Sequence, residues 1–380
     1  MTNFARIGMV AIGFASFAQA SNAGGWDAGT LDTSFMYNEG GYVELSTAPI
    51  TSNIKANIQG QTAKHKMAKD QTRSSFAVKM EYGDFDFGLV SYMSGAIQLD
   101  GQSAHAAGCN PATAAIALCS VVPSADVKMN SLAVLGRYKF SDAFSVMAGA
   151  NRYSIGSGAS VTTLSGYYEV SGEQIVPTYG AAYEMSDIAL RIELIAQPQT
   201  NISNFAAKSS LASSIATTAV SGESMKIPQT MTLNFQSGIA EDTLMFGSVR
   251  QASWKNAQID IPVNGSVSDV ASSFSNKTSY SFGLGRKFTD EFSGSISYAT
   301  EAGGGSTTND AFTLRNGHQT INIGGRYTMD NITLSAGLSY TVTGDVDLTH
   351  LKDDGTASGL TASYKDNTVT AFGLKVGFSF

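Results

Sequence analysis

The sequence predicts an all-β protein, a transmembrane antiparallel β-barrel of about 14 strands. Apolar residues alternate with small or polar ones along many segments of strand length, and this period of two is typical of strands with two different faces. The segments meet alternately at tight acidic turns and at long polar loops, whereas a soluble Greek-key protein mixes its connections. Charged residues make up 14% of the chain, well below the share that is usual in soluble domains.

The expected strands form pairs, and their even number places both ends of the chain at one end of the barrel. Short turns join the members of each pair, at Tyr82–Asp84, Ser141–Asp142, Ser186–Asp187, Glu241–Asp242, Thr289–Glu291 and Asp330–Asn331. Long loops are expected at approximately 60–72, 99–127, 157–173, 203–226, 257–277, 302–318 and 345–366. The strands cover approximately 41–58, 73–83, 85–98, 128–140, 143–156, 174–185, 187–202, 227–239, 243–256, 278–288, 291–301, 319–329, 332–344 and 368–380.

The last strand, Thr368–Phe380, shows the two faces clearly. One face carries Phe372, Leu374, Val376, Phe378 and Phe380, and the other carries Ala371, Gly373, Lys375, Gly377 and Ser379. A closing strand that ends the chain on Phe380 resembles the last-strand signal of bacterial outer-membrane barrels. We therefore expect outer-membrane lipid against the apolar face and recognition of this strand by the barrel assembly machinery. Aromatic residues near strand ends predict an interfacial girdle that includes Tyr138, Phe140, Phe144, Tyr183, Phe288 and Phe292.

The N-terminus predicts export. Residues 1–20 read as a signal peptide, with Arg6 in a positive region, a short apolar run at Ile7–Phe17 and a small-residue cleavage site at Ala18–Ala20; cleavage after Ala23 is a second option. We expect residues 21–40 to form a short plug-like segment and residues 41–380 to form the barrel. Together with the barrel pattern, the signal predicts a location in the outer membrane of a bacterium.

Two cysteines, Cys109 and Cys119, lie in an expected outer loop. An even pair at close spacing in an exported protein predicts a disulfide, which would contribute roughly 2–3 kcal/mol in the chain-entropy model. A metal site needs more ligands nearby, and only His105 is close. We therefore expect the pair to stiffen a surface loop.

Several stretches resemble the FadL/TodX family of outer-membrane transporters for long-chain fatty acids and other hydrophobic compounds. The most specific are a Pro-led strand, an acidic turn and a strand that ends in Trp254 and Lys255, within KIPQTMTLNFQSGIAEDTLMFGSVRQASWKN, and the hairpin HQTINIGGRYTMDNITLSAGLSY. Similar stretches are MEYGDFDFGLVSYMSGAIQL, VLGRYKFSDAFSVMAGANRYSIG and VPTYGAAYEMSDIALRIELIAQPQTNI. The resemblance implies a fourteen-stranded barrel with an N-terminal hatch. It also implies uptake of a hydrophobic ligand that leaves sideways into the membrane at a kinked third strand.

The resemblance places the lateral gate in the third strand, where glycine permits a kink; its candidate residues are Gly88, Ser94 and Gly95. The family's Asn-Pro-Ala hatch motif is absent before the first strand. A short hatch could still use the apolar residues Trp26, Leu31, Phe35, Met36 and Tyr37. Spacing of four residues in Phe205–Val220 predicts a short amphipathic helix, in which Leu211 and Ile215 would line a ligand groove or merely help to cap the barrel.

The sequence offers no catalytic constellation, metal cluster or cofactor motif, so we expect neither an enzyme nor a cofactor. The histidines, His65, His105, His318 and His350, lie scattered in or beside expected loops. The acidic chain, with a net charge of −7, argues against nucleic acid, and we expect a monomer. A general diffusion porin remains an alternative, with a lumen charged by Arg137, Lys139, Arg152, Arg191, Arg250, Arg326 and Lys375. A structural surface barrel is a further alternative.

Overall fold

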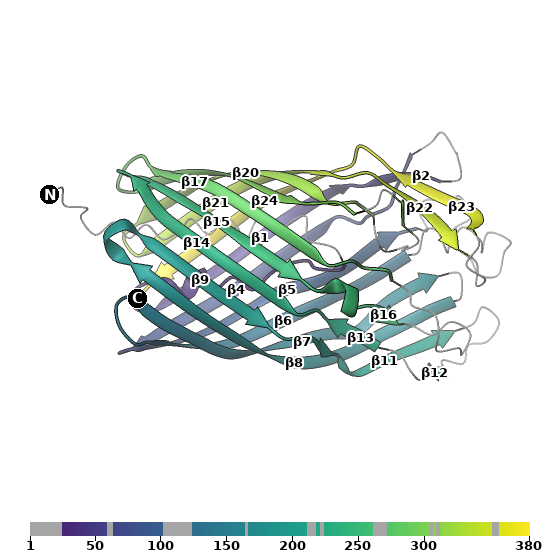
Figure 1. The fold of residues 1–380 in the computed structure, drawn as a ribbon, viewed down its shortest axis with the longest axis horizontal. Coiled ribbons are helices and arrows are strands. Elements are labelled where there is room, and N and C mark those ends of the chain that lie inside the picture. Colours follow the sequence, from purple (N-terminus) through teal and green to yellow (C-terminus); the bar gives the residue numbers. More distant parts are fainter. Residues whose placement is uncertain are drawn as a thin grey trace.

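The computed structural model is a closed barrel of 14 antiparallel strands, which confirms the predicted fold class (Figure 1). It describes residues 25–58, 64–101, 124–163, 166–210, 218–220, 224–260, 272–304, 307–308, 312, 314–351 and 357–380. Successive barrel strands pair in turn, and the ring closes between the last strand and the first. In ring order the strands are β1 (Tyr42–Asn53), β4 (Gln71–Tyr82), β5 (Phe85–Asp100), β6 (Ser124–Lys139), β7 (Phe144–Thr163), β8 (Gly166–Met185), β9 (Leu190–Gln197), β14 (Thr230–Ala240), β15 (Thr243–Ala252), β17 (Lys277–Lys287), β18 (Phe292–Glu301), β20 (His318–Met329), β21 (Ile332–Thr343) and β24 (Thr368–Ser379).

Each of these strands corresponds to a predicted one, because the tight turns fix where they begin and end. Gly83, Asp242 and Asp330 adopt positive φ angles of 58°, 55° and 50°, a conformation that Gly, Asp and Asn tolerate better than other residues. The short turns lie at the end of the barrel where Figure 1 marks the N- and C-termini. We call this the turn end.

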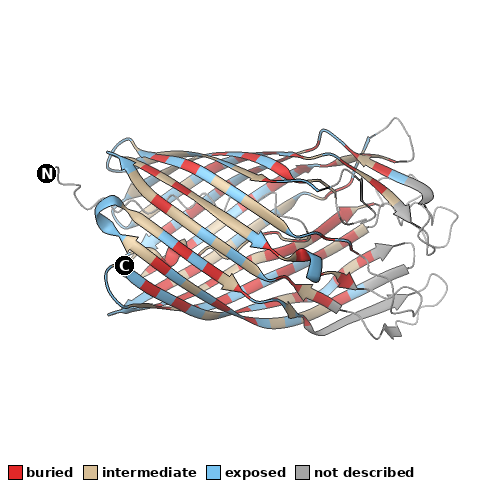
Figure 2. Ribbon diagram, viewed as in Figure 1, coloured by how far each residue is buried: buried red, intermediate tan, exposed pale blue. Residues whose placement is uncertain are grey.

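The two faces of each strand sort apolar residues outward and polar residues inward. On β24, Phe372, Leu374 and Val376 are exposed on the outer wall, while Lys375 is buried beside Glu44 of β1. The same alternation runs along the other strands (Figure 2). An apolar outer wall around a polar interior suits a barrel surrounded by lipid.

Aromatic rings gather on the outer wall near the turn end, where the predicted girdle lies. The centroids of Phe85 and Tyr138 are 4.7 Å apart, and those of Phe144 and Tyr183 are 4.9 Å apart. Rings that are apolar in body and carry a polar edge or hydroxyl favour the boundary between lipid and water. Among the described residues, no helix is long and apolar enough to cross a membrane.

The opposite end carries more strand than predicted, and we call it the loop end. β7 and β8 continue well into the stretch expected as a loop, and the end of β8 pairs with β11 (Ser203–Ser210), which pairs with β12 (Thr218–Val220). The helix predicted at Phe205–Val220 is therefore wrong for these residues, because the projecting edge of β8 offers backbone groups that a further strand satisfies. Leu211 and Ile215 lie outside the described residues.

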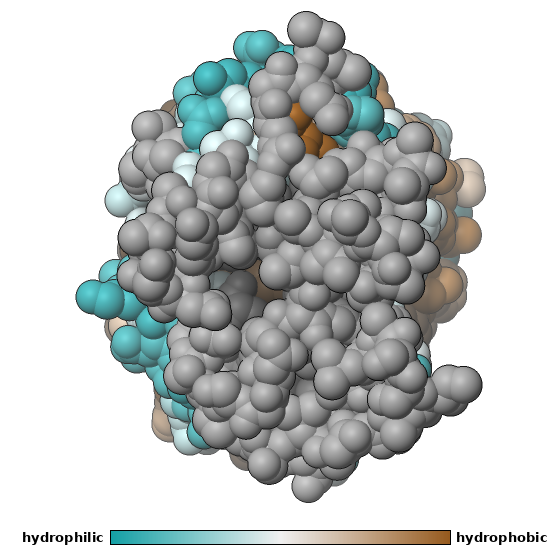
Figure 3. Space-filling model, turned by 90° about the vertical axis from the view of Figure 1, so that its right-hand side faces the viewer, coloured by the Kyte–Doolittle hydropathy of each residue, from teal (hydrophilic) through white to brown (hydrophobic). Residues whose placement is uncertain are grey.

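A small sheet at the loop end packs around an apolar core that it shares with the barrel strands β1 and β24. It contains β2 (Lys55–Ile58), β3 (Lys64–Lys66), β19 (Thr307–Thr308), β22 (Val346–Leu351) and β23 (Ala357–Tyr364). Buried residues such as Ile58, Leu348 and Tyr364 hold it together. Figure 3 looks onto this end, where apolar side chains also show on the flank of the barrel. Residues 1–24, Cys109 and Cys119 lie outside the described residues, so the signal peptide and the disulfide stay predictions.

Candidate functional site

Residues 25–41 run inside the barrel rather than along its wall. Their partners come from strands all around the ring, including β4, β5, β6, β9, β15 and β24. Two parts of this segment differ in how they are held. We call residues 25–29 the tip and residues 32–41 the foot.

The foot is fixed at the turn end by Glu193, whose side chain is buried at 1% exposure. Its carboxylate accepts hydrogen bonds from Thr33 Oγ1 at 2.8 Å, Tyr37 OH at 2.7 Å and Asn234 Nδ2 at 2.9 Å. The guanidinium carbons of Arg137 and Arg191 lie 4.1 and 4.0 Å from the centre of the Tyr37 ring. Tyr37 is thus bound at its hydroxyl and on its ring, a combination of charge-assisted hydrogen bonding and cation–π contact.

Further polar contacts hold the backbone of the foot. Lys79 Nζ donates to the carbonyl oxygens of Asn38 at 2.8 Å and Gly40 at 3.0 Å, and it pairs with Asp86 at 3.0 Å. Arg137 Nη1 donates to the carbonyl oxygen of Met36 at 3.2 Å. Because these charges are buried and paired, they hold the foot in place inside the lumen at the turn end.

Gly88 lies against the foot, and it is not part of a kink. It pairs with Lys79 of β4 and with Leu135 of β6 in regular register, so the strand has no bulge here, and a role for Gly88 in the gate stays a prediction. A Cβ at this position would lie 2.9 Å from Cε2 of Phe35. Glycine here therefore leaves room for the apolar side chains of the foot.

The ladder between β4 and β5 is interrupted beyond Ser91, which pairs with Phe76. From there β5 continues beside β6 to Asp100, and the register shifts between Met93 and Gly95, so that Ser94 is a bulged residue. Contact on the other side resumes only where Lys69 N donates to Gln98 O at 3.2 Å. A bulge bends and twists a strand, which explains why β5 turns away from β4 here.

The tip takes the place of β4 along the interrupted stretch. Ala96 N donates to Trp26 O at 2.8 Å, and Ala28 N donates to Ser94 O at 2.8 Å. Arg73 of β4 donates to Ala28 O, and Arg250 of β15 pairs with Asp27 at 2.8 Å. The tip therefore satisfies backbone groups of β5 that the interrupted ladder leaves without a neighbouring strand.

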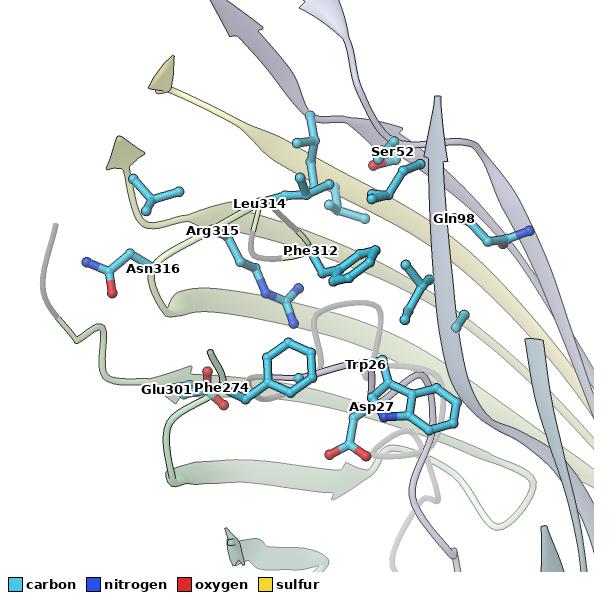
Figure 4. Close-up of a pocket in the computed structure, with 18 of the residues that line it drawn as sticks. Trp26, Asp27, Ser52, Gln98, Phe274, Glu301, Phe312, Leu314, Arg315 and Asn316 are labelled. Carbon is cyan, nitrogen blue, oxygen red and sulfur yellow. The ribbon is translucent and has the colours of Figure 1, made fainter. Parts of the chain in front are cut away.

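A cavity of ≈ 360 Å³ lies between the tip and the loop end (Figure 4). Its lining is mixed. Apolar side chains, among them Trp26, Phe274, Phe312 and Leu314, stand beside four basic residues and two acidic ones, which are Lys69, Arg73, Lys277, Arg315, Asp27 and Glu301. Such a lining suits a ligand with an apolar body and a polar or anionic group.

Arg315 reaches into this cavity between Phe274 and Phe312 (Figure 4). Burial lowers the pKa of its guanidinium, and the charges of Glu301 and Asp27 partly offset this effect. An arginine keeps its proton nonetheless, so the buried cation would gain from an anionic partner. Near the rim, the Lys66 ammonium and the Ser52 N–H lower the pKa of Asp70.

A second cavity of ≈ 40 Å³ lies beside the bulge. Trp26, Ser94, Met129 and Trp254 are among its lining residues. Trp26 lines both cavities, whereas Trp254 lines only the smaller one.

The structure brings most of the predicted interior residues together. Trp26, Phe35 and Met36 are buried, and Leu31 and Tyr37 pack against the same interior. Of the predicted lumen charges, Arg152 is an exception, because it lies on an exposed face beside Glu173. Sequence patterns did not single out Glu193 or Arg315, whose roles depend on which residues meet across the barrel. Within the described part of the chain, no group of His, Cys, Asp and Glu is arranged to hold a metal ion.

No family model and no curated protein matches the chain by sequence. Solved structures do match by fold. A FadL homologue from Pseudomonas aeruginosa superimposes with a TM-score of 0.69 at 14% identity, covering 91% of this chain and 92% of that one. The Pseudomonas putida toluene transporter TodX gives 0.56 at 11% identity over 90% of each chain. The chain has a FadL-type fold. TbuX, a Ralstonia pickettii toluene transporter, shares this FadL-type fold with a TM-score of 0.56 at 11% identity over 96% of this chain and 97% of that one. The resemblance seen in the sequence is confirmed at the level of the fold.

Proposed function

We propose that the protein takes up hydrophobic or amphipathic small molecules across a bacterial outer membrane and releases them sideways into the lipid. The observation that carries this proposal is the β4–β5 ladder that stops beyond Ser91, together with the bulge at Ser94 in the pairing with β6, next to the cavities and away from the foot. A ligand enters at the loop end, occupies the larger cavity, passes the tip and leaves beside the bulge.

Lateral release follows from the solvation of the ligand. Moving an apolar chain from water into lipid recovers about 0.8 kcal/mol per CH₂. Passage through the turn end would instead bring the ligand against a buried network that includes Lys79, Asp86, Arg137 and Glu193. Membrane lipid is therefore the more favourable destination.

Deleting Ser94 tests the route. Without the extra residue, Met93 and Gly95 can pair with Asn130 and Met129 in continuous register, which removes the bend that turns β5 from β4. We expect uptake of a labelled fatty acid by cells to fall about tenfold, the effect of a barrier higher by about 1.4 kcal/mol.

The matched control is Ser94→Ala, which keeps the bulge and loses only the bond from Ser94 Oγ to Met129 O. Its uptake should stay close to that of the wild type. A folded, heat-modifiable deletion variant with normal uptake would contradict lateral release. Free conduction of ions and sugars by the wild-type protein in planar bilayers would favour the general porin instead.

The basic cavity lining favours acidic amphiphiles, such as long-chain fatty acids, over neutral hydrocarbons. Arg315→Gln keeps hydrogen-bonding capacity and removes the charge. We expect uptake of the acid to fall by about tenfold or more, since a hydrogen bond to a charged group contributes about 1.5–3 kcal/mol. Uptake of the methyl ester of the same acid should change little. Equal losses for acid and ester would show that Arg315 does not recognise the carboxylate.

A further inference from the structure

Trp26 contributes to the lining of both cavities. Its side chain is 2% exposed, and it is the one aromatic residue that lines both of them. A ligand that moves from the larger cavity to the bulge must therefore displace or pass this ring. Figure 4 shows the ring at the boundary of the larger cavity, beside Asp27.

The bulge is shaped around this ring. A Cβ on Gly95 would lie 2.6 Å from Trp26 Cε3, closer than real Cβ atoms come to other heavy atoms. Glycine at position 95 thus leaves room for the indole. The backbone of Trp26 is tied to the same place, because its carbonyl oxygen accepts a hydrogen bond from Ala96 N. Any shift of Trp26 is consequently a change in the contacts of the bulged strand.

The indole N–H of Trp26 is buried, and within the described residues it has no hydrogen-bond partner. A buried donor without an acceptor costs free energy and calls for an explanation, such as a water, an ion or a ligand that pairs with it. A ligand with an acceptor oxygen could supply that partner.

We propose that Trp26 is a specificity-determining partition: its ring closes the way to the bulge, and its N–H donates a hydrogen bond to ligands that carry an acceptor oxygen, which favours them over plain hydrocarbons. The inference rests on the proposed function, since it names the residue that controls passage along that route. Trp26 would contact an uncharged acceptor oxygen of the ligand, whereas Arg315 would contact a negatively charged group such as a carboxylate.

The chain offers a direct optical test, because Trp26 and Trp254 are its two tryptophans. In Trp254→Phe, the remaining fluorescence comes from Trp26; in Trp26→Phe, it comes from Trp254, the matched control that lines the smaller cavity alone. On titration with a brominated fatty acid, a quencher, we expect Trp26 to be quenched more strongly than Trp254. Saturable binding of labelled ligand with no stronger quenching of Trp26 would overturn the proposal.

Uptake provides the second arm. Trp26→Phe keeps the ring and loses the N–H, so the preference for a methyl ester over an alkane of equal length should fall about threefold to tenfold, as for one hydrogen bond. Trp26→Ala removes the ring as well, and both compounds should then enter faster. An unchanged ester preference in Trp26→Phe would refute the role of the N–H.

The two proposals fail in different ways. Normal uptake after deletion of Ser94 would reject lateral release and leave the quenching of Trp26 intact. Absent quenching with impaired uptake in the Ser94 deletion would reject the role of Trp26 and leave the route standing.

Discussion

The foot and the tip of the N-terminal segment lie in the same lumen but are held by different kinds of interaction. Side chains hold the foot: Glu193 accepts from Thr33 and Tyr37, and Arg137 and Lys79 bind backbone carbonyls of the foot. Backbone bonds to β5 and the Asp27–Arg250 ion pair hold the tip. A buried, mutually satisfied network resists partial change, whereas a short strand-like contact can be exchanged for another. The foot is therefore a fixed closure and the tip the replaceable part.

The largest effect should come from Glu193→Ala, which removes the carboxylate that holds the foot. Three donors lose their acceptor, and each unpaired group costs about 1–3 kcal/mol. We expect the foot to leave its place and the lumen to conduct ions, measured as channel openings in planar bilayers that the wild type lacks. Glu193→Gln, which keeps one acceptor oxygen, should conduct less. A folded alanine variant that stays closed would show that Glu193 does not hold the foot.

Two matched glycine substitutions sharpen the comparison. Gly88→Ala presses on Met36 and Phe35 of the foot, and Gly95→Ala presses on Trp26 of the tip. Because Phe35 and Met36 are fully buried in the foot, we expect Gly88→Ala to cost about 1–3 kcal/mol of barrel stability, as overpacking does. Gly95→Ala should instead displace the tip, with a smaller loss of stability and a change in uptake. Urea unfolding measures the loss of stability in each variant, and an uptake assay measures the effect on transport. Equal losses of stability in the two variants would show that the tip is held as firmly as the foot.

Tyr37→Phe should give the smallest effect. It removes the hydroxyl that donates to Glu193 and keeps the ring between Arg137 and Arg191. We expect a loss of about 1 kcal/mol, the usual contribution of one hydrogen bond, seen as a lower temperature for loss of the folded band in gels. Tyr37→Leu, which also loses the ring contacts, should cost more. If the two variants unfold alike, the arginines do not stabilise the ring.

The barrel wall could be predicted from sequence because its rules are local. Alternation places Phe372 outward and Lys375 inward, and an acidic turn such as Asp330–Asn331 marks a strand end wherever it occurs. At the loop end the same reasoning is wrong about residues 205–210 and 218–220, which form strands, and misses the extent of β7 and β8. Outside the apolar band, both faces of a strand meet water, so the alternation that marks strands in the wall is lost.

The interior could be predicted only in part. The apolar residues of the N-terminal segment, such as Trp26 and Phe35, stand out in sequence, but their partners do not. Glu193 meets Thr33 across 160 residues of chain, and only the closure of the ring and the depth of the segment decide that contact. The sequence shows Gly88 and Gly95 as positions without a side chain. It does not show that Phe35 occupies the space beside Gly88 and Trp26 the space beside Gly95, because that depends on where the foot and the tip lie.

The two ends of the barrel chain meet at Gly41 and Phe380. Gly41 N donates to Phe380 O at 2.9 Å, and Phe380 N donates to Gly41 O at 2.9 Å, one residue from where the foot joins β1. The seam also fixes the point from which the foot departs. Because Gly41 is held to Phe380 by both of these bonds, the segment that enters the lumen is anchored on the closing pair of strands itself. Any change that loosens the pairing of β1 with β24 should therefore loosen the anchor of the foot as well.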